Sequence, residues 1–144
     1  MQHIDVGTII DRPVAQVFQF VATEHFQNHP KWDPSIVEIT PLSAGPIGVG
    51  TTARVVRKQG PGSLEVTAFE QDRMMTTRSI IGPFTLDMTC SLDAVGADHT
   101  RLRLHAATEA RGPMRLVAPL LKPMFKRTMR RSLATIKTLV EHAD

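Results

Sequence analysis

Two histidines and an aspartate recur at every fourth position near the start of the chain: His25, His29 and Asp33. On one continuous helix these side chains would share a face, and imidazole and carboxylate groups so arranged can hold a metal ion. Pro30 and Pro34 interrupt the spacing, because proline lacks a backbone N–H and disfavours helical geometry in the residue before it. Since no cysteine pair or zinc-protease signature accompanies them, the sequence predicts no metal site and no cofactor.

A possible acid–base set consists of Asp87, His105 and Glu109, on two neighbouring predicted strands. General acid–base catalysis requires such groups to line the same cavity as the substrate. The alternation of apolar and polar residues instead puts Asp87 and His105 on the water-facing side of a sheet, opposite Phe84 and Leu104. A register shift of one residue would reverse that placement, so the catalytic residues remain unknown at this stage.

Arg78 lies in segment 74–81, whose apolar residues do not decide which face points inward. If the face carrying Met74, Arg78 and Ile80 points inward, the guanidinium can anchor a ligand carboxylate or enolate. If the face carrying Met75 and Ile81 points inward, the surface presents small polar and apolar groups. Both alternatives stay open, and an exposed strand arginine is the ordinary case.

Composition removes several other classes of chemistry. The chain has 144 residues, which predicts one domain over residues 1–144. Cys90 is the only cysteine, so no internal disulfide can form, and a lone thiol fits a reducing cytoplasm. There is no tyrosine, which excludes every mechanism that needs a phenol. No apolar run approaches the roughly 18 residues of a membrane span. Since no secretory signal is predicted either, we expect a cytoplasmic protein.

Seven segments have the composition and alternation of β-strands: 2–10, 36–40, 51–58, 63–70, 74–81, 83–95 and 100–110. Their short connections predict antiparallel pairing, because parallel neighbours need long crossovers. Two short helices are expected after the first strand. One begins near Asp11 or Arg12, with Pro13 in its first turn, and the other covers residues 24–28 and ends before Pro30.

The last element is a long amphipathic helix. Pro119 and Pro123 are expected to break or kink its beginning, so the uninterrupted helix should run from near Pro123 to about Glu141. Its apolar stripe contains Phe125, Met129, Ile136, Leu139 and Val140, with Ser132 between them. This stripe would cover the apolar face of the sheet, which makes the chain an α+β domain.

Positive charge is concentrated in this segment. Eight of the 17 basic residues lie between Arg111 and Lys137, and no acid occurs from residue 110 to 140. The simplest interpretation is a solvated helix face. A peripheral membrane contact is the next, since the apolar run 116–121 stands beside Lys122, Lys126 and Arg127. Nucleic acid is not an expected partner, because interleaved aromatic residues are lacking.

Specific motifs add a family resemblance. They are Asp-Arg-Pro-Val-Ala-Gln-Val-Phe at 11–18, His-Pro-Lys-Trp-Asp-Pro at 29–34, Gly-Val-Gly-Thr at 48–51, and the final long helix. In these the whole chain resembles the START-like (SRPBCC) superfamily of helix-grip proteins, and most closely its polyketide cyclase/dehydrase branch. The resemblance implies a curved antiparallel sheet of about six to seven strands wrapped around the C-terminal helix, with a hydrophobic cavity between them.

The resemblance also implies an apolar small-molecule ligand in that cavity. The residues expected to line it are Val55, Val66, Phe84, Leu86, Met88, Leu104, Phe125, Met129 and Ser132, with Arg78 as the conditional polar anchor. The sole tryptophan, Trp32, is instead expected to pack the short helices against the sheet.

Three functions fit such a domain, because a fold constrains chemistry weakly. The leading one is a carrier or sensor that binds a lipid-like or polyketide-like compound. The first alternative is a polyketide cyclase or dehydratase, in which the cavity folds a reactive polyketone. The second alternative is a lipid or quinone chaperone, or an interaction module, that uses the basic helix at a membrane or partner. The sequence leaves the oligomeric state open.

Overall fold

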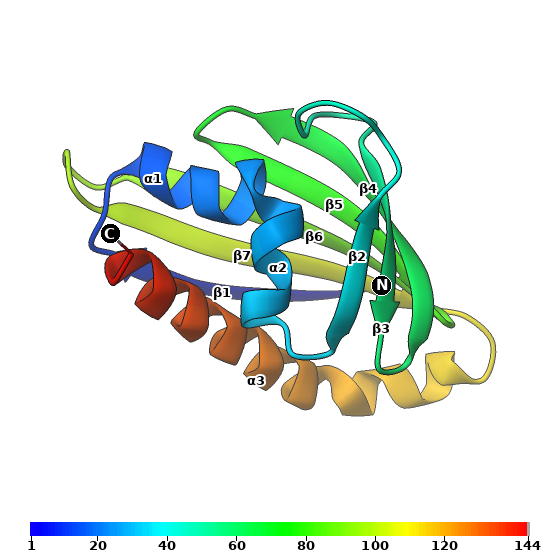
Figure 1. Ribbon diagram of the computed structural model, residues 1–144. Coiled ribbons are helices and arrows are strands. Elements are labelled where there is room, and N and C mark those ends of the chain that lie inside the picture. Colours follow the sequence, from blue (N-terminus) through cyan, green and yellow to red (C-terminus); the bar gives the residue numbers. More distant parts are fainter. Residues whose placement is uncertain (144) are drawn as a thin grey trace.

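The computed structural model describes residues 1–143, and it confirms the α+β helix-grip architecture. A seven-stranded antiparallel sheet with the order β1-β7-β6-β5-β4-β3-β2 curves around the C-terminal helix (Figure 1). The strands are β1 (Gln2–Ile10), β2 (Ile36–Pro41), β3 (Thr52–Arg57), β4 (Gly60–Glu70), β5 (Met74–Ile81), β6 (Phe84–Ala94) and β7 (Thr100–Ala110). The helices are α1 (Val14–Phe18), the π-helical turn η1 (Gln19–Thr23), α2 (His25–Trp32) and α3 (Met114–Glu141).

The two faces of the sheet are separated as the alternation predicts. On the concave face of β6 and β7, Cys90 pairs in register with Leu104, and both are buried. Burial raises the pKa of the Cys90 thiol to about 12, so this cysteine stays protonated and unreactive. On the outer face, Asp87 accepts hydrogen bonds from Arg78, and His105 Nδ1 lies 2.6 Å from a carboxylate oxygen of Asp5.

The first helical segment closes one end of the concave face. Val17, Phe18 and Val21 are buried against the sheet, so α1 and η1 complete the core at that end. The prediction that the next helix ends before Pro30 is wrong: α2 continues through Pro30 to Trp32. Pro30 removes one backbone hydrogen bond. That loss is offset because Trp32 is buried and its carbonyl accepts a hydrogen bond from Ser132 Oγ at 3.0 Å.

The prediction that the last helix starts near Pro123 is also wrong. α3 begins at Met114, directly after Pro113, and contains both Pro119 and Pro123. Each internal proline removes one helical hydrogen bond and favours a bend. The first half of α3 lies largely in solvent, so water can bond to the carbonyl groups that lose their partners. Within residues 1–143 no helix combines the length and hydropathy of a membrane span.

The two halves of α3 are held very differently. In the C-terminal half, Met129, Leu133, Ile136 and Val140 are buried against the sheet and α2. Polar contacts fix the same end: Lys137 Nζ donates to the Ile9 carbonyl at 2.5 Å, and Glu141 accepts from the Asp11 N–H at 2.8 Å. In the N-terminal half, by contrast, Leu116, Leu120 and Met124 are 84%, 78% and 61% exposed.

This difference between the two halves predicts that substitutions in them change the free energy of unfolding by different amounts. Leu133 is 4% exposed, so Leu133→Ala should lower the free energy of unfolding by about 2–5 kcal/mol through the cavity it leaves. The matched control, Leu120→Ala, should change it by less than about 0.5 kcal/mol, because that side chain lies in solvent. Urea unfolding followed by the fluorescence of Trp32 measures both, and equal losses would contradict the division.

Candidate functional site

The packing between α3 and the sheet loosens toward the start of the helix. On β6, Cys90 and Leu92 are fully packed, whereas Leu86 and Met88 on the same face are only half-buried. Phe125, one turn of α3 before the buried Met129, is half-buried as well. We call this region, where β6 begins, β7 ends and α3 begins, the open end of the grip.

A hollow of about 240 Å³ lies at the open end. It is lined by Met1, Gln2, Phe84, Thr108, Glu109, Ala110, Arg115, Ala118 and Pro119. The sheet supplies one wall from the ends of three neighbouring strands, and the first turns of α3 supply the other. Thr108 and Ala110 continue the inward alternation of Leu102, Leu104 and Ala106, so the sequence pattern already contained the signal that would have found them.

Four of the residues expected to line a cavity instead lie in the filled core: Val55, Val66, Leu104 and Met129. A ligand can reach them only if α3 or its neighbours move, and their role in binding stays a prediction. Phe84, Leu86, Met88 and Phe125 lie at the open end, where apolar surface is accessible. Ser132 is half-buried, and its hydroxyl is used in the hydrogen bond to the Trp32 carbonyl.

Arg78 requires a correction, because it does not point into the grip. Met75, Thr77 and Ser79 are the buried residues of β5, which places Arg78 on the outer face. There its guanidinium donates two hydrogen bonds to Asp87, at 2.8 and 3.1 Å. The inner face of β5 therefore presents two small hydroxyl groups, those of Thr77 and Ser79, in place of a cation. Ser79 pairs in register with the half-buried Leu86.

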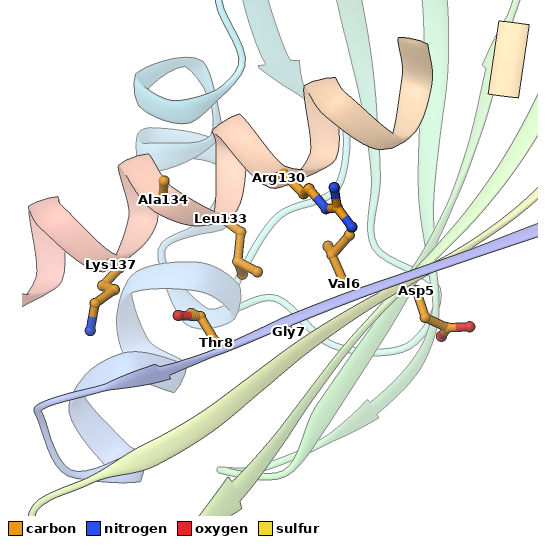
Figure 2. A pocket seen from close by; sticks show the side chains of 8 residues that line it. All are labelled: Asp5, Val6, Gly7, Thr8, Arg130, Leu133, Ala134 and Lys137. Atoms are coloured by element: carbon orange, nitrogen blue, oxygen red, sulfur yellow. The ribbon is translucent and has the colours of Figure 1, made fainter. Parts of the chain in front are cut away.

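A second hollow, of about 420 Å³, lies between β1 and the C-terminal half of α3, and no sequence signal marks it. Figure 2 shows the side chains of Arg130, Leu133 and Lys137 directed from α3 toward β1. Arg130 and Lys137 bring positive charge to this hollow, and Lys137 is already bonded to β1 and to Glu141. We regard the open end as the better site for an apolar ligand, because Phe84, Leu86, Met88 and Phe125 present half-buried apolar surface there.

The residues with metal-ligand spacing form a buried polar cluster that joins α2 to β3. Asp33 accepts a hydrogen bond from Arg57 at 2.8 Å and another from the Ser35 hydroxyl at 2.6 Å. His29 Nε2 lies 3.5 Å from the same carboxylate, and the His25 and His29 rings are 4.5 Å apart. Within residues 1–143, no group of three potential ligands is arranged to hold a metal ion.

Burial controls the protonation of this cluster. His25 Nδ1–H donates to the Val21 carbonyl at 3.0 Å, which leaves the buried Nε2 without a partner. Desolvation lowers the pKa of His25 to about 3 and also lowers the pKa of His29. Burial alone would raise the pKa of Asp33, but its hydrogen bonds and the Arg57 charge lower it well below the usual value. The cluster anchors α2 to the sheet through the hydrogen bond from Arg57 to Asp33, and none of the three side chains lines either hollow.

The lowered histidine pKa values predict acid sensitivity. Below about pH 6.5 the unfolded chain takes up protons on both imidazoles, whereas the native His25 stays neutral down to about pH 3. Stability therefore falls as the pH falls, by about 1.4 kcal/mol per pH unit for His25, and the lowered pKa of His29 acts in the same direction. In His25→Gln the slope between about pH 6 and 4.5 should be smaller by that amount.

Urea unfolding at a series of pH values measures this slope. His142→Gln, which removes an exposed imidazole in the last turn, is the control. A His25→Gln slope equal to that of the unmodified protein would show that His25 does not carry the linkage.

Comparison with solved structures shows the fold independently. The di-domain aromatase/cyclase BexL of the BE-7585A biosynthetic pathway matches with a TM-score of 0.76 at 18% identity, over 98% of this chain and 47% of that chain. This chain therefore spans about half the length of the di-domain protein. The Zhui aromatase/cyclase of Streptomyces sp. R1128 matches with a TM-score of 0.77 at 14% identity, over 97% and 93% of the two chains. Truncated norcoclaurine synthase from Thalictrum flavum matches with a TM-score of 0.76 at 11% identity, over 99% and 95%.

No curated protein matches the sequence. The sequence profile of the family described as "Polyketide cyclase / dehydrase and lipid transport" matches residues 1–141, nearly the whole chain. The grip of β-strands around α3 is the architecture that this match and the solved structures share. The chain belongs to the polyketide cyclase/dehydrase and lipid transport family.

Proposed function

We propose that the protein binds a hydrophobic small molecule at the open end of the grip, as a carrier or sensor. The observation that carries the proposal is the half-buried apolar surface of Phe84, Leu86, Met88 and Phe125, beside a hollow at the loosely packed start of the α3 interface. A folded chain normally buries such inner-face side chains, so their incomplete packing leaves apolar area for a guest.

The size of the hollow limits the mode of binding. Ligand pockets typically measure about 300–1,000 Å³, somewhat more than the 240 Å³ present here. A larger guest requires the N-terminal half of α3 to move outward, and few buried contacts oppose that movement. Apolar burial of roughly 200 Å² would contribute about 5 kcal/mol before the entropic cost of association. The Thr77 and Ser79 hydroxyls are the nearest polar groups on the inner face of β5.

The family and its structural neighbours support this proposal in two ways. The family description includes lipid transport, and the solved aromatase/cyclases share the helix-grip fold.

A neutral apolar dye, N-phenyl-1-naphthylamine, provides a direct test. The unmodified protein should enhance its fluorescence saturably. Leu86→Arg should weaken the affinity at least about tenfold, because an unpaired charge would face the apolar dye. Thr85→Arg, on the outer face of the same strand, is the matched control and should bind normally. Native mass spectrometry of freshly purified protein would identify a co-purifying ligand.

Circular dichroism establishes that each variant is folded. Phe84→Ala removes apolar surface without adding charge, so it tests the same site if Leu86→Arg does not fold. Normal dye affinity in folded Leu86→Arg and Phe84→Ala would exclude the open end as the binding site.

A cyclase or dehydratase activity is a second candidate, because Glu109 and Arg115 line the hollow at the open end together. A carboxylate beside a bound ketone can remove the proton next to the carbonyl, and a guanidinium can stabilise the resulting enolate oxygen. Glu109 pairs with Thr85 on the outer face of the sheet, so its carboxylate reaches the hollow only around the end of β7. Both side chains are exposed to solvent, where water weakens these effects.

This candidate predicts exchange of the methyl protons of acetophenone for deuterium faster than in buffer alone, measured by proton NMR. Glu109→Gln should return the rate to that of buffer while leaving dye binding intact, since the change keeps the size of the side chain. No acceleration by the unmodified protein would remove the enzymatic candidate without affecting the binding proposal.

A further inference from the structure

The outer side of α3 carries an exposed apolar ridge. Leu116, Leu120 and Met124 follow one another at intervals of four residues, so they share one face of the helix. All three are more than half exposed, and Val117 beside them is 41% exposed. This ridge faces away from the buried side chains of the C-terminal half, and nothing in the described chain covers it.

Basic side chains continue and flank the same ridge. Arg127 and Arg131 extend its spacing along the helix, and both are exposed. Within residues 1–143, no ion pair involves Arg115, Lys122, Lys126, Arg127, Arg130 or Arg131. The nearest acids in sequence, Glu109 and Glu141, lie outside this acid-free stretch. Arg127 and Arg131 therefore place unpaired positive charge on the same helix face as the exposed leucines.

We propose that this face of α3, from Leu116 to Arg131, docks on the surface of an anionic lipid bilayer. The leucines and Met124 would enter the boundary between headgroups and acyl chains, as the apolar faces of interfacial helices do. Arg127 and Arg131 would lie at the level of the anionic headgroups.

The chemistry of the face distinguishes lipid from other partners. A nucleic acid would pair with the basic residues but offers no apolar phase to exposed leucines, and the face lacks aromatic residues for base stacking. A second copy of the chain would bring two positively charged helices together, which is unfavourable. A bilayer with anionic lipids satisfies both the apolar and the basic groups.

The docking face and the open end share the first turns of α3. Arg115, Ala118 and Pro119 line the hollow, while Leu116 and Leu120 project outward between them. Docking would therefore hold the open end beside the lipid phase. The docking proposal does not depend on ligand binding, because its test uses empty protein and measures vesicle partition alone.

Sedimentation with sucrose-loaded vesicles tests the proposal, with folding of every variant checked by circular dichroism. One vesicle type is phosphatidylcholine, and the other contains roughly one third phosphatidylserine. The unmodified protein should partition onto the anionic vesicles at least about tenfold more strongly at about 0.1 M salt. About 0.5 M salt should remove most of that preference.

Two pairs of variants separate the contributions. Arg127→Glu with Arg131→Glu should reduce partition onto anionic vesicles by at least about tenfold. Its control, Arg101→Glu with Arg103→Glu, makes the same charge change on the outer face of β7 and should have a much smaller effect. Leu116→Ser with Leu120→Ser should also weaken binding, whereas Val37→Ser with Leu42→Ser, two exposed apolar residues elsewhere, should not.

Equal partition onto neutral and anionic vesicles would overturn the proposal, as would normal binding by the Arg127/Arg131 variant. Salt-sensitive binding to DNA or RNA without vesicle binding would identify the face as a nucleic-acid surface. A dimer in analytical ultracentrifugation that Leu116→Ser with Leu120→Ser dissociates would identify it as a self-association surface.

Discussion

The packing of α3 against the concave face of the sheet determines which surfaces of the molecule are accessible. Four buried side chains of its C-terminal half pack on the concave face, and Lys137 and Glu141 bond to the corner between β1 and α1. These contacts fix the helix at one end only. The other end contains two prolines and presents its apolar side chains to solvent. Where α3 is held, its buried side chains fill the core, although a hollow of about 420 Å³ remains between it and β1; where it is not held, its apolar side chains are accessible.

Both proposed roles follow from this asymmetry. The inner side of the free half borders the half-buried residues of β6 and the hollow beside them, while its outer side carries the exposed leucines and unpaired arginines. Ligand binding on the inner side would depend on apolar burial, and docking on the outer side would depend partly on charge attraction. Added salt weakens the charge attraction and leaves apolar burial largely intact. Opposite faces of the same few turns can therefore serve a small guest and a surface.

Local patterns in the sequence predicted the strands, their antiparallel pairing and the outward placement of Asp87 and His105, because alternation directly reports burial on one face. The same rules failed at Pro30, Pro119 and Pro123. Each proline removes one helical hydrogen bond. In α2 the packing of Trp32 outweighs that loss, and in α3 water can bond to the carbonyl groups that lose their partners. Both effects depend on the tertiary structure, so the local sequence does not reveal them. The residues expected to line a cavity fall partly in the core and partly at the open end for a similar reason. How deeply Val55 or Met129 is packed depends on the angle of α3, which no sequence pattern specifies.

The methionines provide the most direct test of a grip that is closed at one end and open at the other. Methyl NMR of 13C-labelled methionine, during titration with N-phenyl-1-naphthylamine, reports on half-buried Met88 at the open end and on buried Met75 and Met129 in the core. The account predicts shift changes concentrated at Met88, with Met75 and Met129 little affected. Changes centred on Met75 and Met129, or saturable dye binding without any change at Met88, would contradict it.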